Sequence, residues 1–266
     1  MPKMPDVLAR LGIQEDEELL FEPIIEHAAA WEGFMDVETM ADYYEAVQRY
    51  IRTVTLSYAN RGIKFQSLDG VMISPFAVIG EGTVIFPNVQ IRHGVKIGRN
   101  CVIGSGSIIE NSTVGDNCVI NSTQIYQSVL DSHVKIGPFC HVRPNTHLCE
   151  GVKIGDFVEV KNSTVGRDTH ASHLTYIGDS DVGERVNFGC GTVTVNYDGK
   201  RKFRTVIGND AFIGCNTNLV APVHIGDHGY TAAGSTITDD VPESSLGIAR
   251  ARQVNKDGWV TKKNQT

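Results

Sequence analysis

The chain has 266 residues, of which 41% are hydrophobic and 21% are charged, and its formal net charge is −7. This balance is ordinary for a soluble globular protein, and no apolar run reaches the roughly 18 residues that a membrane-spanning helix needs. The N-terminus lacks the layout of a signal peptide, and the six cysteines form no C-x-x-C pair, so we expect buried, reduced thiols in a cytoplasmic protein.

Charge is distributed unevenly along the chain. Residues 1–50 hold twelve acidic residues against three basic ones, a net charge of about −9, which leaves about +2 for the remainder. An acidic segment of this kind argues against nucleic acid as its partner. The mildly cationic remainder would suit an anionic substrate.

The first 62 residues predict a small α-helical domain. One helix is expected over Glu17–Trp31, interrupted near Pro23, and a second from an N-cap at Asp36 to a stop at 60–62 (NRG). The simplest role of this acidic domain is to cap the open end of whatever follows. Binding a dedicated partner is the alternative.

An aliphatic residue then returns about every six positions. The series begins at Ile73, Ile79, Ile85, Ile91, Ile97, Ile103 and Ile109, continues with occasional five-residue steps to Val165, and resumes from Ile207 to Ile237. A six-residue period fits neither an amphipathic helix nor a long strand. It predicts short strands joined by tight turns, with three such units closing a triangular coil of about 18 residues. We therefore expect an all-β fold, a parallel β-helix over residues 63–250, followed by a C-terminal tail over 251–266.

Two segments break the period, 170–176 and 196–204, and loops that interrupt a solenoid often form its working surface. The repeat also places Arg143 and Lys161 one coil apart, directly above one another. Like charges stacked in this way are unfavourable unless an anion lies between them, so we infer a phosphate site. The alternative is a pair of cations that point into solvent.

His173 lies in the first of these segments and is a candidate general base, because an imidazole can take a proton near neutral pH. The alternative is an ordinary polar residue at a turn. Glu159 precedes Val160 and would lie on a coil next to Tyr176. It is either a carboxylate that orients the base or a solvated residue at a turn.

Several motifs in fixed order give the chain a family likeness. These are 143–145 (RPN), 155–161 (GDFVEVK), 173–179 (HLTYIGD), 186–189 (VNFG), 194–200 (TVNYDGK) and 250–257 (RARQVNKD). Over about residues 40 to 260 the chain resembles the acetyltransferase half of the bacterial bifunctional glucosamine-1-phosphate acetyltransferase/N-acetylglucosamine-1-phosphate uridylyltransferase family. The resemblance implies a left-handed β-helix, acetyl-CoA as co-substrate, no metal, and a homotrimer with sites between subunits. A separate uridylyltransferase would act downstream.

The resemblance also assigns roles to residues. His173 would accept the proton of the glucosamine amine, and Glu159 would orient the site. The sugar phosphate would be held by Arg143, Lys161, Tyr176, Asn187 and Lys202. The acetyl-CoA site would be formed by Cys190, Asn196, Tyr197, Cys215, Ala233 and Arg250.

Three departures from the family pattern stand out. Cys215 takes the place of the usual Ser, and Cys190 that of the usual Ala, so the affinity for CoA is expected to differ. Residues 1–70 contain no Gly-rich nucleotide loop and are too short for a uridylyltransferase domain. We therefore expect no uridylyl transfer in this chain and no Mg²⁺ for it.

Three other functions stay open. The acceptor could be another amino-sugar phosphate or a nucleotide-linked amino sugar. A γ-type carbonic anhydrase shares the β-helix, but it needs three zinc-binding histidines, and His141, His147, His170 and His173 have no convincing ligand spacing. A non-catalytic scaffold needs only the aliphatic columns, and has no use for the histidine, the stacked cations and the loop together. Neither nucleic acid nor membrane is an expected partner.

Overall fold

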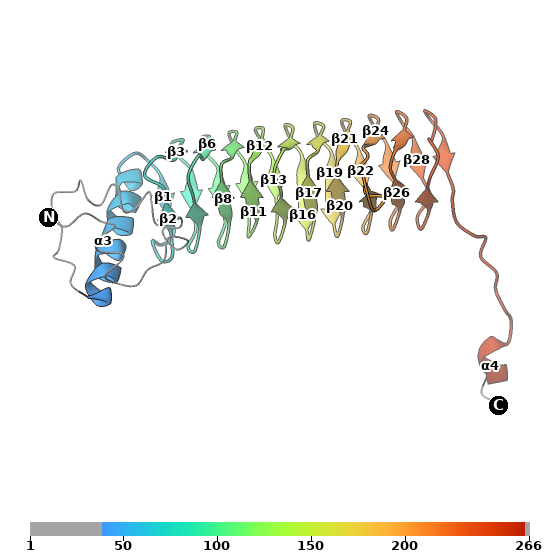
Figure 1. The fold of residues 1–266 in the computed structure, drawn as a ribbon, viewed down its shortest axis with the longest axis horizontal. Coiled ribbons are helices and arrows are strands. Elements are labelled where there is room, and N and C mark those ends of the chain that lie inside the picture. Colours follow the sequence, from blue (N-terminus) through green and yellow to red (C-terminus); the bar gives the residue numbers. More distant parts are fainter. Residues whose placement is uncertain (1–38, 264–266) are drawn as a thin grey trace.

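The computed structural model describes residues 39–263. In this range one long helix, α3 (Met40–Ala59), precedes a stack of triangular coils, and a short helix, α4 (Trp259–Lys263), follows it (Figure 1). The predicted all-β, left-handed parallel β-helix is confirmed. The helix predicted over Glu17–Trp31 lies outside the described residues. The limits of the three segments, 1–62, 63–250 and 251–266, stay a prediction.

Three parallel sheets form the three faces of the coil stack, and we name them A, B and C. Sheet A contains β1 (Lys64–Phe65), β4 (Val84–Ile85), β7 (Val102–Ile103), β10 (Val119–Ile120), β13 (Lys135–Ile136), β16 (Lys153–Asp156), β19 (His170–His173), β22 (Asn187–Phe188), β25 (Phe212–Ile213), β28 (Tyr230–Thr231) and β30 (Leu246–Gly247). Sheet B contains β2 (Met72–Ile73), β5 (Gln90–Ile91), β8 (Ile108–Glu110), β11 (Gln124–Tyr126), β14 (His141–Val142), β17 (Glu159–Lys161), β20 (Tyr176–Gly178), β23 (Val193–Val195), β26 (Asn218–Val220) and β29 (Thr236–Ile237). Sheet C contains β3 (Val78–Ile79), β6 (Lys96–Ile97), β9 (Thr113–Val114), β12 (Ser128–Leu130), β15 (Thr146–Leu148), β18 (Thr164–Val165), β21 (Ser180–Val182), β24 (Thr205–Ile207) and β27 (Val223–Ile225).

The aliphatic residues of the repeat form continuous columns inside the coil. On sheet A, Ile85 pairs with Ile103 and Ile103 with Ile120, and all three are fully buried. Burial of each such side chain contributes about 1.5–3 kcal/mol. Ile79, near the N-terminal end of the stack, is only partly buried. The interior therefore repeats from coil to coil, and chemical variety is confined to side chains that point outward.

Helix α3 closes the N-terminal end of the stack. Its N-cap is Thr39, not the predicted Asp36, because Thr39 and Asp42 form a reciprocal capping box that satisfies the first free N–H groups. It ends at Ala59 with Asn60 as its C-cap, where the stop at 60–62 was predicted. The hydroxyl of the buried Tyr58 shares its hydrogen between two carbonyl oxygens, that of Ser74 at 2.8 Å and that of Ala77 at 2.7 Å. These bonds attach the helix to the first coil.

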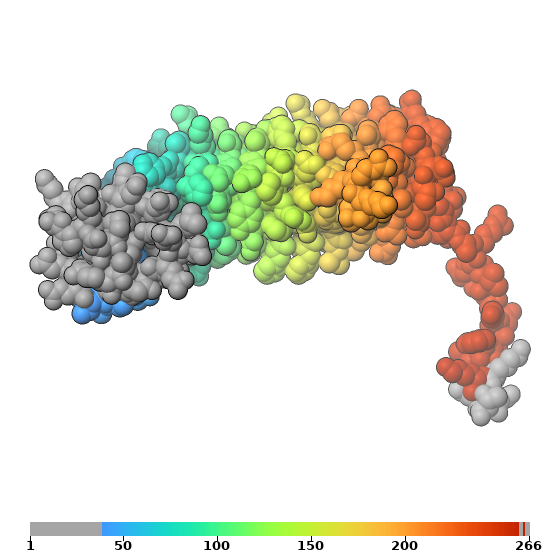
Figure 2. All heavy atoms as spheres, in the orientation of Figure 1, coloured from blue at the N-terminus to red at the C-terminus, as the bar shows by residue number. Residues whose placement is uncertain are grey.

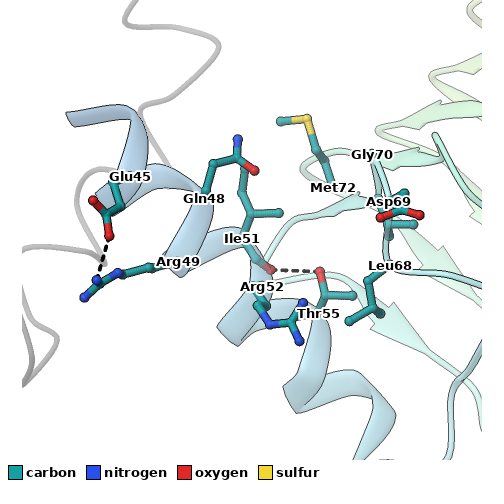
Figure 3. Close-up of a pocket in the computed structure, with 11 residues that line it drawn as sticks. Glu45, Gln48, Arg49, Ile51, Arg52, Thr55, Leu68, Asp69, Gly70 and Met72 are labelled. Atoms are coloured by element: carbon teal, nitrogen blue, oxygen red, sulfur yellow. Dashed lines mark hydrogen bonds and ion pairs between the residues drawn. The ribbon is translucent and has the colours of Figure 1, made fainter. Parts of the chain in front are cut away.

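A shallow pocket of about 420 Å³ lies between α3 and the first coil, where residues 45–55 face residues 68–72 (Figure 3). The drawn bonds, Arg49 to Glu45 and Thr55 to the Ile51 carbonyl, are internal to the helix. None of the predicted site residues lines this pocket. Within the described residues, no helix is both long and apolar enough to cross a membrane.

Candidate active site

The two cations predicted to stack do lie on adjacent coils of sheet B. Val142 of β14 pairs with Val160 of β17, so Arg143 and Lys161 occupy the next positions in register. The backbone N–H of Arg143 donates to the Val160 carbonyl at 2.8 Å. Both side chains leave the outward face at the edge of sheet B that adjoins sheet C. The structure therefore confirms the stacking that the repeat predicts.

A third cation reaches the same edge from the inserted loop 196–204. This loop forms a small hairpin in which Tyr197 and Lys202 make an antiparallel bridge, and the Asp198 carboxylate accepts the backbone N–H groups of residues 200 and 201. These two bonds hold the pKa of Asp198 below its ordinary value. Arg204 fixes the base of the hairpin through a bidentate ion pair with Asp181. In Figure 2 the region around residue 200, in orange, stands out as a raised mass on the side of the coil.

The electrostatics of Lys161 reflect this crowding. Its pKa is lowered from the ordinary 10.5, first by the neighbouring Lys202 amine, then by partial burial and by repulsion from Lys202 and Arg143. Asp179 acts in the opposite direction. Lys202 and Arg143 thus disfavour the charge of Lys161 in the absence of an anion. This arrangement suits a dianionic phosphate.

Tyr176 joins the cation cluster because of a glycine. Its ring lies along sheet B over Gly178, where an added Cβ would come within 2.3 Å of Oη and 2.5 Å of Cζ. Gly178 pairs with Lys161 across β17 and β20. Only a residue without a side chain lets the tyrosine hydroxyl reach the column of Lys161. No pattern in the sequence predicts this requirement.

Asp179 is a residue of this site that sequence reasoning missed. It lies at the corner between sheets B and C and is only 4% exposed. Its two carboxylate oxygens accept hydrogen bonds from the side-chain amides of Asn162 and Asn196. Its own carbonyl accepts the N–H of Thr205, the first residue after the loop, at 3.1 Å. A buried carboxylate needs such partners, and here they connect the lower coil to both ends of the loop.

Asn196 is therefore turned toward the protein. Besides Asp179, its amide nitrogen lies 3.4 Å from the Tyr176 hydroxyl, and the side chain is buried. The neighbouring Tyr197 is 57% exposed, with its hydroxyl donating to the Gly199 carbonyl at 2.7 Å. Of the two residues assigned together to acetyl-CoA, one positions the site from inside and the other faces outward.

Glu159 contacts Arg143 of the cation cluster. Its carboxylate accepts a hydrogen bond of 2.7 Å from Arg143 Nη1, and both side chains are a little over one third exposed. Across the ladder Glu159 pairs with Tyr176. His173 lies instead at the corner between sheets A and B, in register with Asp156, and is exposed. Glu159 thus orients Arg143 and borders the tyrosine, whereas the imidazole stands at the other edge of sheet B.

His173 begins a column that contains three residues already assigned to acetyl-CoA, and their stacking above the histidine was not predicted. Ala171 pairs with Phe188, Phe188 with Ile213, and Ile213 with Thr231. Counting two positions onward from each pair places Cys190, Cys215 and Ala233 above His173 on successive coils. All three were assigned to acetyl-CoA, and the column leads to Gly234, whose added Cβ would lie 3.8 Å from Arg250 Cδ. A line of small side chains ending at an imidazole is a suitable path for a thin, extended thioester arm.

Some expectations fit less well. The cysteines were predicted to be buried, and three are, but Cys149 and Cys190 are half-buried and Cys215 is exposed, because they occupy outward positions just after a strand. Asn187 lies on sheet A in the column of His170, on a different face from the cation cluster. The four histidines weighed as zinc ligands lie on three different faces: His141 on sheet B, His147 on sheet C, and His170 and His173 on sheet A.

Comparison with known proteins agrees with the hexapeptide-repeat fold. The family model "Bacterial transferase hexapeptide (six repeats)" matches residues 76–111 and 204–239, and "GlmU-like, C-terminal hexapeptide" matches residues 104–195. The chain is 44% identical to the bifunctional protein GlmU of Halalkalibacterium halodurans over 98% of its own length and 56% of that protein's. It is 50% identical to the GlmU of Caldicellulosiruptor saccharolyticus over 87% of its own length and 50% of that protein's. The chain thus spans about half the length of the curated relatives it matches.

Among solved structures, a UDP-N-acetylglucosamine acyltransferase of Arabidopsis superposes with a TM-score of 0.50 at 18% identity. The superposition covers 68% of this chain and 70% of that one. At this level of identity the likeness concerns the fold alone.

Proposed function

The chain belongs to the hexapeptide-repeat transferase family of the GlmU type, and on this premise we propose that it is an N-acetyltransferase acting on glucosamine 1-phosphate. The donor is acetyl-CoA, and the products are N-acetylglucosamine 1-phosphate and CoA. The observation that carries the proposal is the meeting of Arg143, Lys161 and Lys202 at one edge of sheet B, with His173 at the other edge.

In this proposal the cation cluster holds the phosphate of the acceptor. Arg143 offers a planar fork that can bind two phosphate oxygens, while Lys161 and Lys202 act as point charges. The Tyr176 hydroxyl, held over Gly178, supplies a further hydrogen bond. Asn187 lies on sheet A, away from this cluster, and in this proposal it contacts the substrate of a second copy of the chain. A bound phosphate offsets the repulsion among the cations and so raises the pKa of Lys161. The charged Lys161 in turn strengthens phosphate binding.

His173 takes up the proton that the amine must lose. As the amine nitrogen forms its bond to the acetyl carbon, the proton passes to the imidazole, the carbon–sulfur bond of the thioester breaks, and CoA leaves as the thiolate. The imidazolium then returns the proton to the sulfur, which frees the base for the next cycle. The column of Cys190, Cys215 and Ala233 directs the thioester arm toward the histidine, with Arg250 near its far end. Asn196 and Tyr197, at the opposite edge of sheet B, keep their assignment to acetyl-CoA as part of the proposal. Glu159 acts through Arg143, since the ion pair of 2.7 Å fixes the guanidinium.

Asp179 is a positioning residue in this scheme. Its carboxylate joins Asn162 of the lower coil to Asn196 at the start of the loop, and its charge raises the pKa of Lys161. It therefore sets both where Lys202 is presented and how readily Lys161 keeps its proton. A homotrimer, a cytoplasmic location and a separate downstream uridylyltransferase remain part of the proposal.

A thiol-release assay with the purified chain and acetyl-CoA tests the reaction. Glucosamine 1-phosphate is compared with glucosamine, glucosamine 6-phosphate and a nucleotide-linked glucosamine at equal concentrations. We expect the highest kcat/KM with glucosamine 1-phosphate and little turnover of unphosphorylated glucosamine. A clear preference for the 6-phosphate or for the nucleotide sugar would move the proposal to that acceptor. No CoA release with any acceptor would favour the non-catalytic scaffold.

A further inference from the structure

Sheet C carries a second cluster of reactive side chains that the proposed function does not use. Leu130 of β12 pairs with Leu148 of β15, so Asp131 and Cys149, which follow these strands, occupy adjacent coils in register. His147, the middle residue of β15, points outward beside them, with Nε2 3.0 Å from Asp131 Oδ1. One ligand atom from each of the three residues lies within 4.8 Å of the other two.

The backbone holds these residues in place. The N–H of Asp131 donates to the Leu148 carbonyl at 2.8 Å, and the N–H of Cys149 donates to the Val165 carbonyl at 2.9 Å. Both bonds belong to the regular ladder between coils. The side chains are half-buried, with 42% of the Asp131 and 43% of the His147 side chain exposed. The cluster is therefore accessible to solvent and carried by rigid strands.

The three side chains are a suitable ligand set for zinc. A carboxylate oxygen, an imidazole nitrogen and a thiolate all bind Zn²⁺, at bond lengths of about 2.0–2.3 Å. Tetrahedral ligands at such bond lengths lie about 3.4 Å apart, so the three ligand atoms, which lie within 4.8 Å of one another, must draw closer on binding. The carboxylate and thiolate together balance the charge of a divalent ion. A groove of about 520 Å³, lined by Asp131, Cys149 and Glu184 among others, leaves the fourth position open to water.

The position on sheet C is not in itself sufficient to create such a cluster. His224 is the middle residue of β27 and is exposed on the same face, in the same outward position as His147. Among residues 39–263, however, the set of Asp131, His147 and Cys149 is the one place where three potential ligands come this close. The ion pair of Asp131 and His147 accounts for two of these residues. It gives no role to the half-buried thiol directly in register with the carboxylate.

We propose that Asp131, His147 and Cys149 bind one zinc ion, which links two neighbouring coils on sheet C. On binding, the Cys149 thiol releases its proton to solvent and the thiolate coordinates the metal. The imidazole exchanges its contact with the carboxylate for the ion. The site is separate from the residues assigned to acetyl transfer, which lie on or just after strands of sheets A and B, in the loop 196–204 and, for Arg250, after β30. It stands whether or not the proposed reaction is correct.

Cobalt and zinc titrations of the full chain, stripped of metal with a chelator, test this site. Co²⁺ bound to a thiolate gives a charge-transfer band in the near ultraviolet, and we expect such a band to saturate at one equivalent. Cys149→Ser should abolish the band, and His147→Ala should weaken Zn²⁺ binding, measured by calorimetry, more than about tenfold. The matched control His224→Ala should bind as the wild type does.

Circular dichroism confirms that each variant folds, and Zn²⁺ should raise the Tm of the wild type but not that of Cys149→Ser. The absence of a charge-transfer band in the wild type would overturn the proposal. So would a band that persists in Cys149→Ser, since it would come from another accessible thiol such as Cys190 or Cys215.

Discussion

Sheets B and C are built from the same coils, yet they present opposite chemistry to solvent. Their inward columns are alike: Val142 and Val160 on sheet B and Leu148 and Val165 on sheet C are all fully buried. Outward, sheet B gathers three cations beside a tyrosine, whereas sheet C gathers a carboxylate, an imidazole and a thiol. The coil therefore acts as a neutral frame. What each face binds depends on a few outward residues and on where the loop between β23 and β24 lies.

His173→Ala tests the corner between sheets A and B. Loss of a general base should lower kcat by roughly 10²–10⁴-fold with little change in the KM for glucosamine 1-phosphate. Steady-state kinetics measure both constants. The control His224→Ala removes an exposed histidine from sheet C and should leave them unchanged. Full activity in His173→Ala would exclude His173 as the base.

Lys161→Met tests the outward face of sheet B. It keeps much of the side chain's length but removes the charge, so we expect the KM for glucosamine 1-phosphate to rise by about 10- to 100-fold. The KM for acetyl-CoA should change far less. An equal rise for both substrates would indicate general damage to the site rather than loss of a phosphate contact.

Asp179→Asn tests the support beneath that face. An asparagine presents an NH₂ group to one of the two amides that now donate to the carboxylate, so one of these bonds is lost. We expect kcat/KM to fall about tenfold, less than the roughly 100-fold that a 1 Å misplacement can cost. A thermal melt distinguishes this local effect from loss of the fold. We expect a Tm close to that of the wild type, although kcat/KM falls.

The pH dependence of kcat/KM tests the charges directly. Lys161 is a cation below its pKa, and that pKa is lowered mainly by Lys202. As the pH rises, Lys161 therefore loses its charge, and phosphate binding weakens, at a lower pH than it would with an ordinary lysine. Lys202→Gln removes the cause and should move the alkaline limb of the profile to higher pH. Asp179→Asn removes an opposing charge and should move it to lower pH. Shifts in the same direction for both variants would contradict this assignment.

Ile177→Val tests the neutral frame. Ile177 is fully buried beneath Tyr176, and loss of one methylene should lower the free energy of unfolding by about 0.5–1.5 kcal/mol. Denaturant titration measures this change. The value of kcat should stay as in the wild type, because inward residues of sheet B stabilise the fold and outward residues contact the substrate. A large loss of kcat without a loss of stability would refute that separation.

The sequence by itself determined the coil and part of the site. A six-residue period forces the aliphatic residues inward, and residues in the same phase of successive coils must stack, so the meeting of Arg143 and Lys161 followed from spacing alone. The end of helix α3 near Asn60 could equally be predicted from the sequence. Its start was not, because Thr39 and Asp36 are both plausible caps and only the capping box with Asp42 decides between them.

Tertiary structure alone decided the rest. Lys202 lies in an insertion that interrupts the period, so no count of residues places it near Lys161. Its position depends on the ion pair of Arg204 with Asp181 and on the bonds of Asp179. The ring of Tyr176 over Gly178 and the meeting of His147 with Cys149 and Asp131 depend on side-chain direction. A repeat fixes the path of the backbone, but side-chain rotamers and an irregular loop are set by neighbours distant in the sequence.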